Sequence, residues 1–120
     1  MILTGAFLAE AASVVDNKLN VSGGVLSRYV VGPDRSASFL LVLLTQAEAG
    51  NPDRGVAVEI WPPTGDKPLE LAYEVPPASA VSEIGFAFFD LEVSMPSDGR
   101  WVLLVSGGSG AISLPLEVSS

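Results

Sequence analysis

The chain contains no cysteine and no histidine among its 120 residues. Their absence excludes Ser-His-Asp and Cys-His catalysis, histidine or thiolate zinc sites and iron–sulfur ligation. It also excludes disulfide bonds, which is compatible with a reducing cytoplasm, so we expect a cytoplasmic protein. We therefore expect no enzyme and no cofactor.

Basic residues are also scarce, since six Lys and Arg stand against fourteen Asp and Glu, for a formal net charge of -8. An acidic chain repels the phosphates of nucleic acids, and its few basic residues are scattered from Lys18 to Arg100. We therefore expect no nucleic-acid partner. No apolar run is long enough to span a membrane, so we expect a soluble chain. Residues 1–12 are apolar but lack the leading Lys or Arg of a signal peptide, and we expect them to be part of the fold.

A chain of this length forms one ordinary domain, here residues 1–120, and can bury roughly two-thirds of the surface of its unfolded form. Its last third predicts three strands joined by two turns rich in Gly, Pro and Asp. Pro115 cannot donate a ladder hydrogen bond, so its strand should lie at a sheet edge or carry a bulge there. Residues 101–106 are apolar on both parities, which predicts a strand covered on both faces.

Upstream, residues 38–46 are the most hydrophobic run and should lie in the middle of a sheet. Residues 6–15 fit both a helical stripe and a strand, and the β context favours a strand with a bend. Gly23-Gly24 interrupts the extended stretch 19–31 and predicts a bulge or a close backbone approach. The predicted strands cover residues 6–15, 19–31, 38–46, 56–61, 69–75, 86–93, 101–106 and 111–118. Seven or eight short strands with turns between them predict an all-β fold, an immunoglobulin-like antiparallel β-sandwich.

The run Phe-Leu-Ala-Glu-Ala-Ala-Ser-Val-Val-Asp-Asn-Lys-Leu-Asn-Val-Ser-Gly-Gly (residues 7–24) resembles the opening of a group of small, uncharacterised bacterial β-sandwich proteins. In that group an Ala-rich start leads into Lys-Leu-Asn-Val-x-Gly-Gly. The resemblance extends to Pro96, the Asp98-Gly99 turn and the Leu-Pro-Leu-x-Val ending, while Asn17 stands where the group would have glycine. It implies a fold and no activity, since the group has no assigned function, and it supplies no functional residues.

Two sets of residues with side-chain oxygens are candidate chemical sites. Asp90 and Glu92 share one strand face and could form a catalytic pair, but exposed acids are ordinarily solvated charge or protection of a sheet edge. Loop oxygens could ligate calcium, although none occurs with alternating ligand spacing, and turn chemistry explains them better. These loop residues are Asp16, Asn17, Asp34, Asp53 and Asp98. We expect no catalytic residue and no metal site.

Trp61, Phe86 and Phe88 lie opposite the core parity of their strands and form the candidate interaction surface. The alternative is that the sandwich covers them. The predicted function is a non-enzymatic binding or assembly module that associates through an apolar sheet face or a sheet edge, with itself or with a protein partner. The alternative function is a small-ligand or carbohydrate-binding domain that uses exposed aromatics.

Overall fold

The computed structural model describes residues 1–120 and contains ten β-strands and one short helix. The predicted all-β class is confirmed. Helix α1 has five residues, so no helix of the chain could cross a membrane. In chain order the elements are β1 (Ile2–Ala9), β2 (Ala11–Val15), β3 (Lys18–Ser22), β4 (Arg28–Val30), β5 (Ser36–Gln46), β6 (Gly55–Trp61), β7 (Leu69–Glu74), α1 (Pro77–Val81), β8 (Gly85–Ser94), β9 (Gly99–Gly107) and β10 (Ala111–Ser119).

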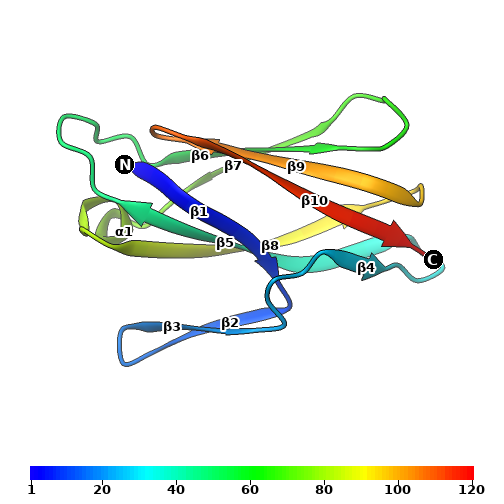
Figure 1. Cartoon of the computed structure of the whole chain (residues 1–120), viewed down its shortest axis with the longest axis horizontal. Coiled ribbons are helices and arrows are strands. Elements are labelled where there is room, and N and C mark those ends of the chain that lie inside the picture. The colour runs from blue at the N-terminus through cyan, green and yellow to red at the C-terminus, as the bar shows by residue number, and fades with distance from the viewer.

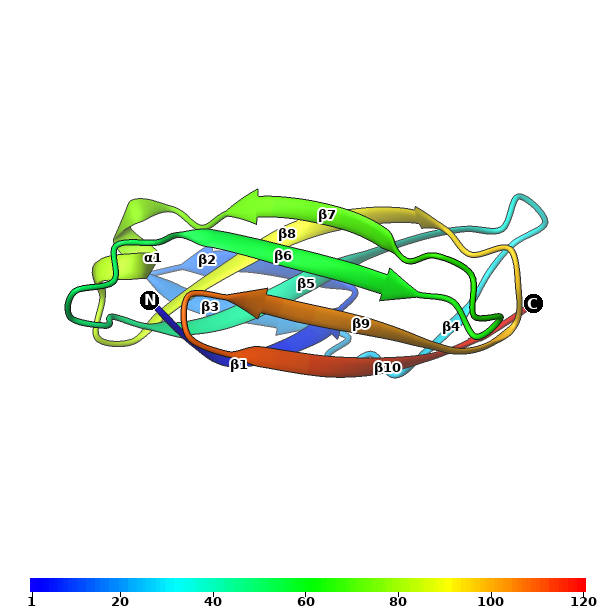
Figure 2. The same cartoon turned by 90° about the horizontal axis from the view of Figure 1, so that it is seen from above.

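The strands form two facing sheets and a separate hairpin (Figures 1 and 2). One sheet has three strands in the order β1-β5-β8, and the other has five in the order β4-β10-β9-β6-β7. The pairing is antiparallel except between β4 and β10, which run parallel, so the prediction of purely antiparallel sheets is wrong at that edge. Strands β2 and β3 pair only with each other and form a hairpin, residues 11–22, that we call the arm.

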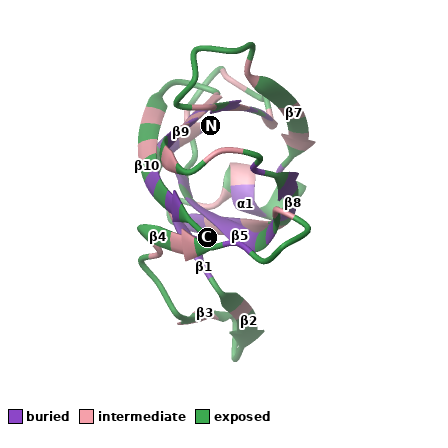
Figure 3. Cartoon of the chain, turned by 90° about the vertical axis from the view of Figure 1, so that its right-hand side faces the viewer, coloured by how far each residue is buried: buried purple, intermediate pink, exposed green.

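The main core lies between the two sheets, and the buried parts of their strands are coloured purple in Figure 3. Leu41 of β5, Val58 of β6 and Leu103 of β9 are fully buried within it. Burial of one such side chain contributes roughly 1.5–3 kcal/mol. As predicted, β5 occupies the middle of its sheet. The predicted full cover of β9 is wrong, because no third layer lies on the five-stranded sheet and its outward side chains Val102 and Leu104 are half-exposed.

Ten strands form instead of seven or eight because two predicted strands each divide in two. Residues 6–15 are extended, as favoured, and a bend at Glu10 separates β1 from β2. The stretch 19–31 divides at Gly23-Gly24 into β3 and β4, which belong to different sheets. A Cβ on Gly24 would lie 2.9 Å from Val21 Cγ1 and 3.2 Å from the Phe7 ring, which confirms the predicted close approach.

The two long sides of the sandwich are closed in different ways. On one side the N–H of Leu3 donates to the carbonyl of Ser109 (3.3 Å), and the N–H of Ser109 donates to the carbonyl of Met1 (3.0 Å). On the other side β7 and β8 are both sheet edges and do not pair. There the ring of Tyr73 stacks on that of Phe89. Strand β10 is neither the edge strand of its sheet nor bulged at Pro115, because β4 pairs with its end. Pro115 lies in the part of β10 that β4 does not reach, so its missing N–H leaves no ladder bond unmade.

Candidate functional site

The outer face of the three-stranded sheet carries a second apolar layer, separate from the main core. The strand register places Phe7, Val42 and Phe88 side by side in one row, with Leu44 and Phe86 in the next. Cross-strand neighbours on one face of a sheet are close enough for aromatic and branched side chains to pack. The outer face is therefore an apolar surface that water would contact unless something covers it.

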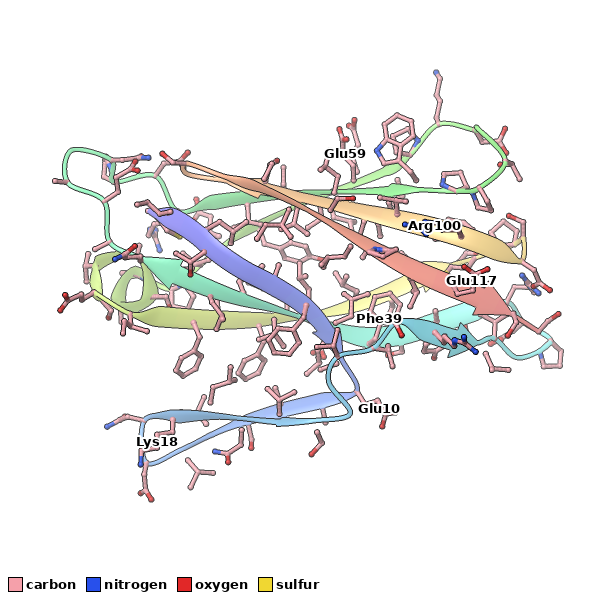
Figure 4. The ribbon with its side chains drawn as sticks, viewed as in Figure 1. Glu10, Lys18, Phe39, Glu59, Arg100 and Glu117 are labelled. Atoms are coloured by element: carbon pink, nitrogen blue, oxygen red, sulfur yellow. The ribbon has the colours of Figure 1, made fainter.

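The arm covers part of this surface (Figure 4). Val42 has an exposed fraction of 0%, and Ala9 and Leu40 are also buried, although none of the three belongs to the main core. The register of the hairpin gives the arm one apolar face, and Val21 on that face lies beside Phe7 near Gly24. The other face is mostly polar, and the tip carries Lys18. The apolar face consists of Ala12, Val14, Leu19 and Val21.

A turn with left-handed backbone at its two central residues makes this arm possible. Asp16 and Asn17 have φ of 52° and 60°, as a two-residue hairpin turn that matches strand twist requires. Asn and Asp tolerate this conformation better than other non-glycine residues, which explains how Asn17 can stand where the resembling group would have glycine. The local sequence thus fixes the hairpin independently of the sandwich.

Where the arm stops covering the sheet, a groove of about 560 Å³ opens along β8, and we call it the β8 groove. This volume is in the range of ordinary ligand-binding pockets. Val14 of the arm is 52% exposed at one wall, and Ile84, which precedes β8, is 87% exposed. Half-buried Phe86 and Phe88 lie along the groove, and Ser79 of α1 borders it. Seven of the thirteen residues that line the groove are hydrophobic.

The backbone of β8 is covered at its start and open further along. The Ser79 hydroxyl donates to the carbonyl of Phe86 at 2.6 Å, on the side of β8 away from β5. The N–H of Ser38, which lies opposite Glu92, donates to the Tyr29 hydroxyl at 3.1 Å and so points away from β8. In antiparallel pairs the hydrogen-bonded and non-bonded positions alternate. The N–H and C=O groups of Phe88, Asp90 and Glu92 therefore face the free edge of β8.

The structure does not bring the three predicted surface residues together. Phe86 and Phe88 lie on the outer face of the three-stranded sheet, within the β8 groove. Trp61 lies on the outer face of the five-stranded sheet, across the core from them, beside Glu59 of the same strand. It is 40% exposed, and its Nε1–H donates to Glu59 Oε1 at 3.1 Å. The reason is topological, since β6 and β8 belong to different sheets.

The predicted acidic pair stays together as a surface feature. Asp90 and Glu92 are exposed on the outer face of β8, directly beyond Phe88. They lie opposite Leu40 and Ser38 of β5, and no third acidic side chain joins them in a group that could hold a metal ion. They do not line the β8 groove, and they give the outer face of β8 beyond Phe88 a negative charge.

Three of the loop residues that could ligate calcium, Asp34, Asp53 and Asp98, have structural partners of their own. The Ser36 hydroxyl and N–H donate to Asp34, and these hydrogen bonds hold the pKa of Asp34 below its ordinary value. The Asp53 carboxylate accepts from the N–H of Gly55. Asp98 pairs with Arg35 at 2.8 Å, and the guanidinium lowers the pKa of Asp98. These carboxylates shape turns and do not converge on one point.

No protein-family model matches this chain, and no curated protein is significantly similar to it in sequence.

Sequence reasoning found Phe86 and Phe88 but missed Val14 and Ile84, which share the groove with them. A signal for Val14 was present, because apolar residues alternate symmetrically about the Asp16-Asn17 turn. That pattern predicts a hairpin with one apolar face. No local signal marks Ile84, since its place in the groove depends on how α1 leads into β8.

Proposed function

We propose that this chain is a non-enzymatic binding module that associates with a protein through the β8 groove and the free edge of β8. The observation that carries the proposal is the pairing of two half-exposed phenylalanines, Phe86 and Phe88, with an unpaired strand edge. Aromatic side chains in partly enclosed pockets commonly dominate binding energy. An open strand edge offers main-chain hydrogen bonds to an extended partner.

The rest of the molecule supports a binding role over a chemical one. Histidine and cysteine are absent, and the exposed acids Asp90 and Glu92 have no third acidic neighbour to form a metal group. The arm covers Val42 but leaves Phe86 and Phe88 in contact with solvent. An apolar surface that is covered only in part is typical of an interaction site.

Site-specific photo-crosslinking in the native host tests this proposal. A photoreactive residue at position 88 should give one defined adduct, with a second copy or with another protein. The same residue at position 30, where Val30 is exposed on β4 of the other sheet, should not give that adduct. The absence of an adduct from position 88, or the same adducts from both positions, would contradict the proposal.

A second candidate function, the binding of a carbohydrate or another small ligand, rests on Trp61. Its indole N–H is held by Glu59, so one aromatic face is fixed and open to solvent. The other tryptophan, Trp101, is buried and donates to the carbonyl of Ser97, so a ligand should change only the fluorescence of Trp61. Titration with glycans and metabolites should quench the wild-type chain but not Trp61→Phe. No quenching with any of them would exclude this function.

We also propose that the sandwich is of the immunoglobulin-like type and that the chain is related to the bacterial group that its opening resembles. Two facing sheets around a buried tryptophan, Trp101, support the architecture. The arm and the parallel β4–β10 pair would be additions to it. An experimental structure with a different connection of the two sheets would overturn this part of the proposal.

A further inference from the structure

We propose that the occupant of the β8 edge is an extended segment of another protein. This segment carries two basic residues, Lys or Arg, followed by an apolar residue, each separated from the next by one residue. This inference rests on the proposed function and specifies its partner. The segment would add to the three-stranded sheet as a fourth strand, antiparallel to β8. Its sequence would read basic-x-basic-x-apolar, with the basic residues opposite Glu92 and Asp90 and the apolar residue opposite Phe88.

The open backbone groups fix where such a strand can pair. Helix α1 already uses the carbonyl of Phe86 through Ser79, so pairing cannot extend to the start of β8. The groups of Phe88, Asp90 and Glu92 face the edge, and no strand pairs with them there. Three consecutive bonding positions of this kind would accept a partner segment of about five residues.

The side chains beside these positions fix the chemistry of the partner. Phe88 lines the β8 groove together with Val14 of the arm, so the residue opposite Phe88 should be apolar. Asp90 and Glu92 follow on the same face and are exposed. Opposite charges directly across two strands stabilise the pair, and like charges destabilise it. The net charge of -8 adds a long-range attraction for a basic partner.

A second copy of the chain fits this edge poorly. If two β8 strands paired about a twofold axis, one register would place Asp90 opposite Asp90, and the next would place Asp90 opposite Glu92. A further register would place Asp90 opposite Phe88. Each leaves a carboxylate against another carboxylate or against a ring, and α1 blocks the registers nearer the start of β8. Asp90 and Glu92 therefore disfavour pairing of β8 with a second copy and favour its pairing with a basic strand.

A synthetic peptide, Thr-Lys-Thr-Lys-Thr-Leu-Thr, tests this inference with the whole chain. We expect it to bind and to shift the backbone amide resonances of residues 86–94 more than those of β6 or β9. A peptide with Glu in place of both Lys should bind at least tenfold more weakly. Methylation of the two Lys backbone nitrogens should abolish binding. Methylation of the Thr nitrogens at the third and fifth positions of the peptide should not, because these alternate groups point away from β8.

The double variant Asp90→Lys/Glu92→Lys should lose about tenfold in affinity for the Lys peptide and gain affinity for the Glu peptide. A matched control, Glu70→Lys/Glu117→Lys, makes the same change in net charge on the outer face of the five-stranded sheet and should bind the Lys peptide nearly as wild type does. Circular dichroism checks that both variants keep their β signal.

Several results would overturn the inference. These are no binding of the Lys peptide, equal affinity for the Lys and Glu peptides, equal losses in the two double variants, or a position-88 crosslink only to a second copy. A crosslink from position 88 to another protein, together with failure of the peptide, would leave the proposed function standing and reject only the basic segment.

Discussion

The ring of Tyr73 on β7 stacks on the ring of Phe89 on β8, with centroids 4.7 Å apart and planes inclined by 27°. These two strands are the unpaired edges of opposite sheets, so the stack joins them where no backbone hydrogen bond does. We expect a double-mutant cycle of Tyr73→Leu and Phe89→Leu to give a coupling energy of about 0.5–1.5 kcal/mol. Urea unfolding measures it, and strictly additive losses would show that the rings do not hold the edges together.

Alkaline pH should weaken the same contact. Burial raises the pKa of Tyr73 above its ordinary value of 10.0. Because the folded chain resists ionisation of the phenol, this contribution to stability is present below pH 10 and is lost as pH rises through the folded pKa. The unfolding midpoint of the wild-type chain should therefore fall more steeply between pH 9 and 11 than that of Tyr73→Phe. Parallel curves for the two chains would contradict the assignment.

The two apolar layers should differ in their contribution to stability. Leu41 faces the main core and Val42 faces the arm, and both are fully buried. We expect Leu41→Ala to lower the free energy of unfolding by about 2–5 kcal/mol and Val42→Ala by about 1–2 kcal/mol, because less cover surrounds Val42. The exposed control Val30→Ala should stay within about 0.5 kcal/mol. Equal losses at positions 30 and 42 would show that the arm does not cover the sheet.

Acid should remove the ion pair between Arg35 and Asp98, which links the turn before β5 to the turn after β8. The guanidinium lowers the pKa of Asp98 below 3.8, so its contribution is present above that pH and is lost as pH falls through the folded pKa. Asp98→Asn should lower the urea midpoint at pH 7 and leave it unchanged near pH 2. The exposed Glu83→Gln is the control, and a pH-independent effect of Asp98→Asn would argue against pairing.

A strand or turn of this fold could be predicted from the sequence where the contacts that determine it are local. The alternation of Leu69, Leu71 and Tyr73 gave β7 correctly, and the apolar run around Leu41 gave the central strand, since burial on one or both faces leaves a period in the sequence. The Asp16-Asn17 turn carries a local signal of the same kind, because its backbone angles demand particular residues.

The partners of each strand could not be foreseen, because strand pairing joins residues far apart in sequence. The sequence of residues 11–22 does not indicate that this hairpin lies outside the two sheets. A strand with one apolar face fits equally well within the sandwich or in a separate hairpin. For the same reason, Trp61 and Phe88 were predicted to share one surface. Both do point away from the core, as their strand parity predicts, but they belong to different sheets. The partial exposure of Leu104 could not be predicted either, because it depends on the absence of a third layer over β9.

Strand β8 keeps an open edge at alternate residues, and this edge can be measured by amide hydrogen exchange of the unliganded chain. The amides of Ala87, Phe89 and Leu91 bond to β5 and should exchange slowly. The amides of Phe88, Asp90 and Glu92 face the free edge and should exchange at least a hundredfold faster. Uniform slow exchange along residues 87–92 would mean that the edge is already paired and would contradict the account.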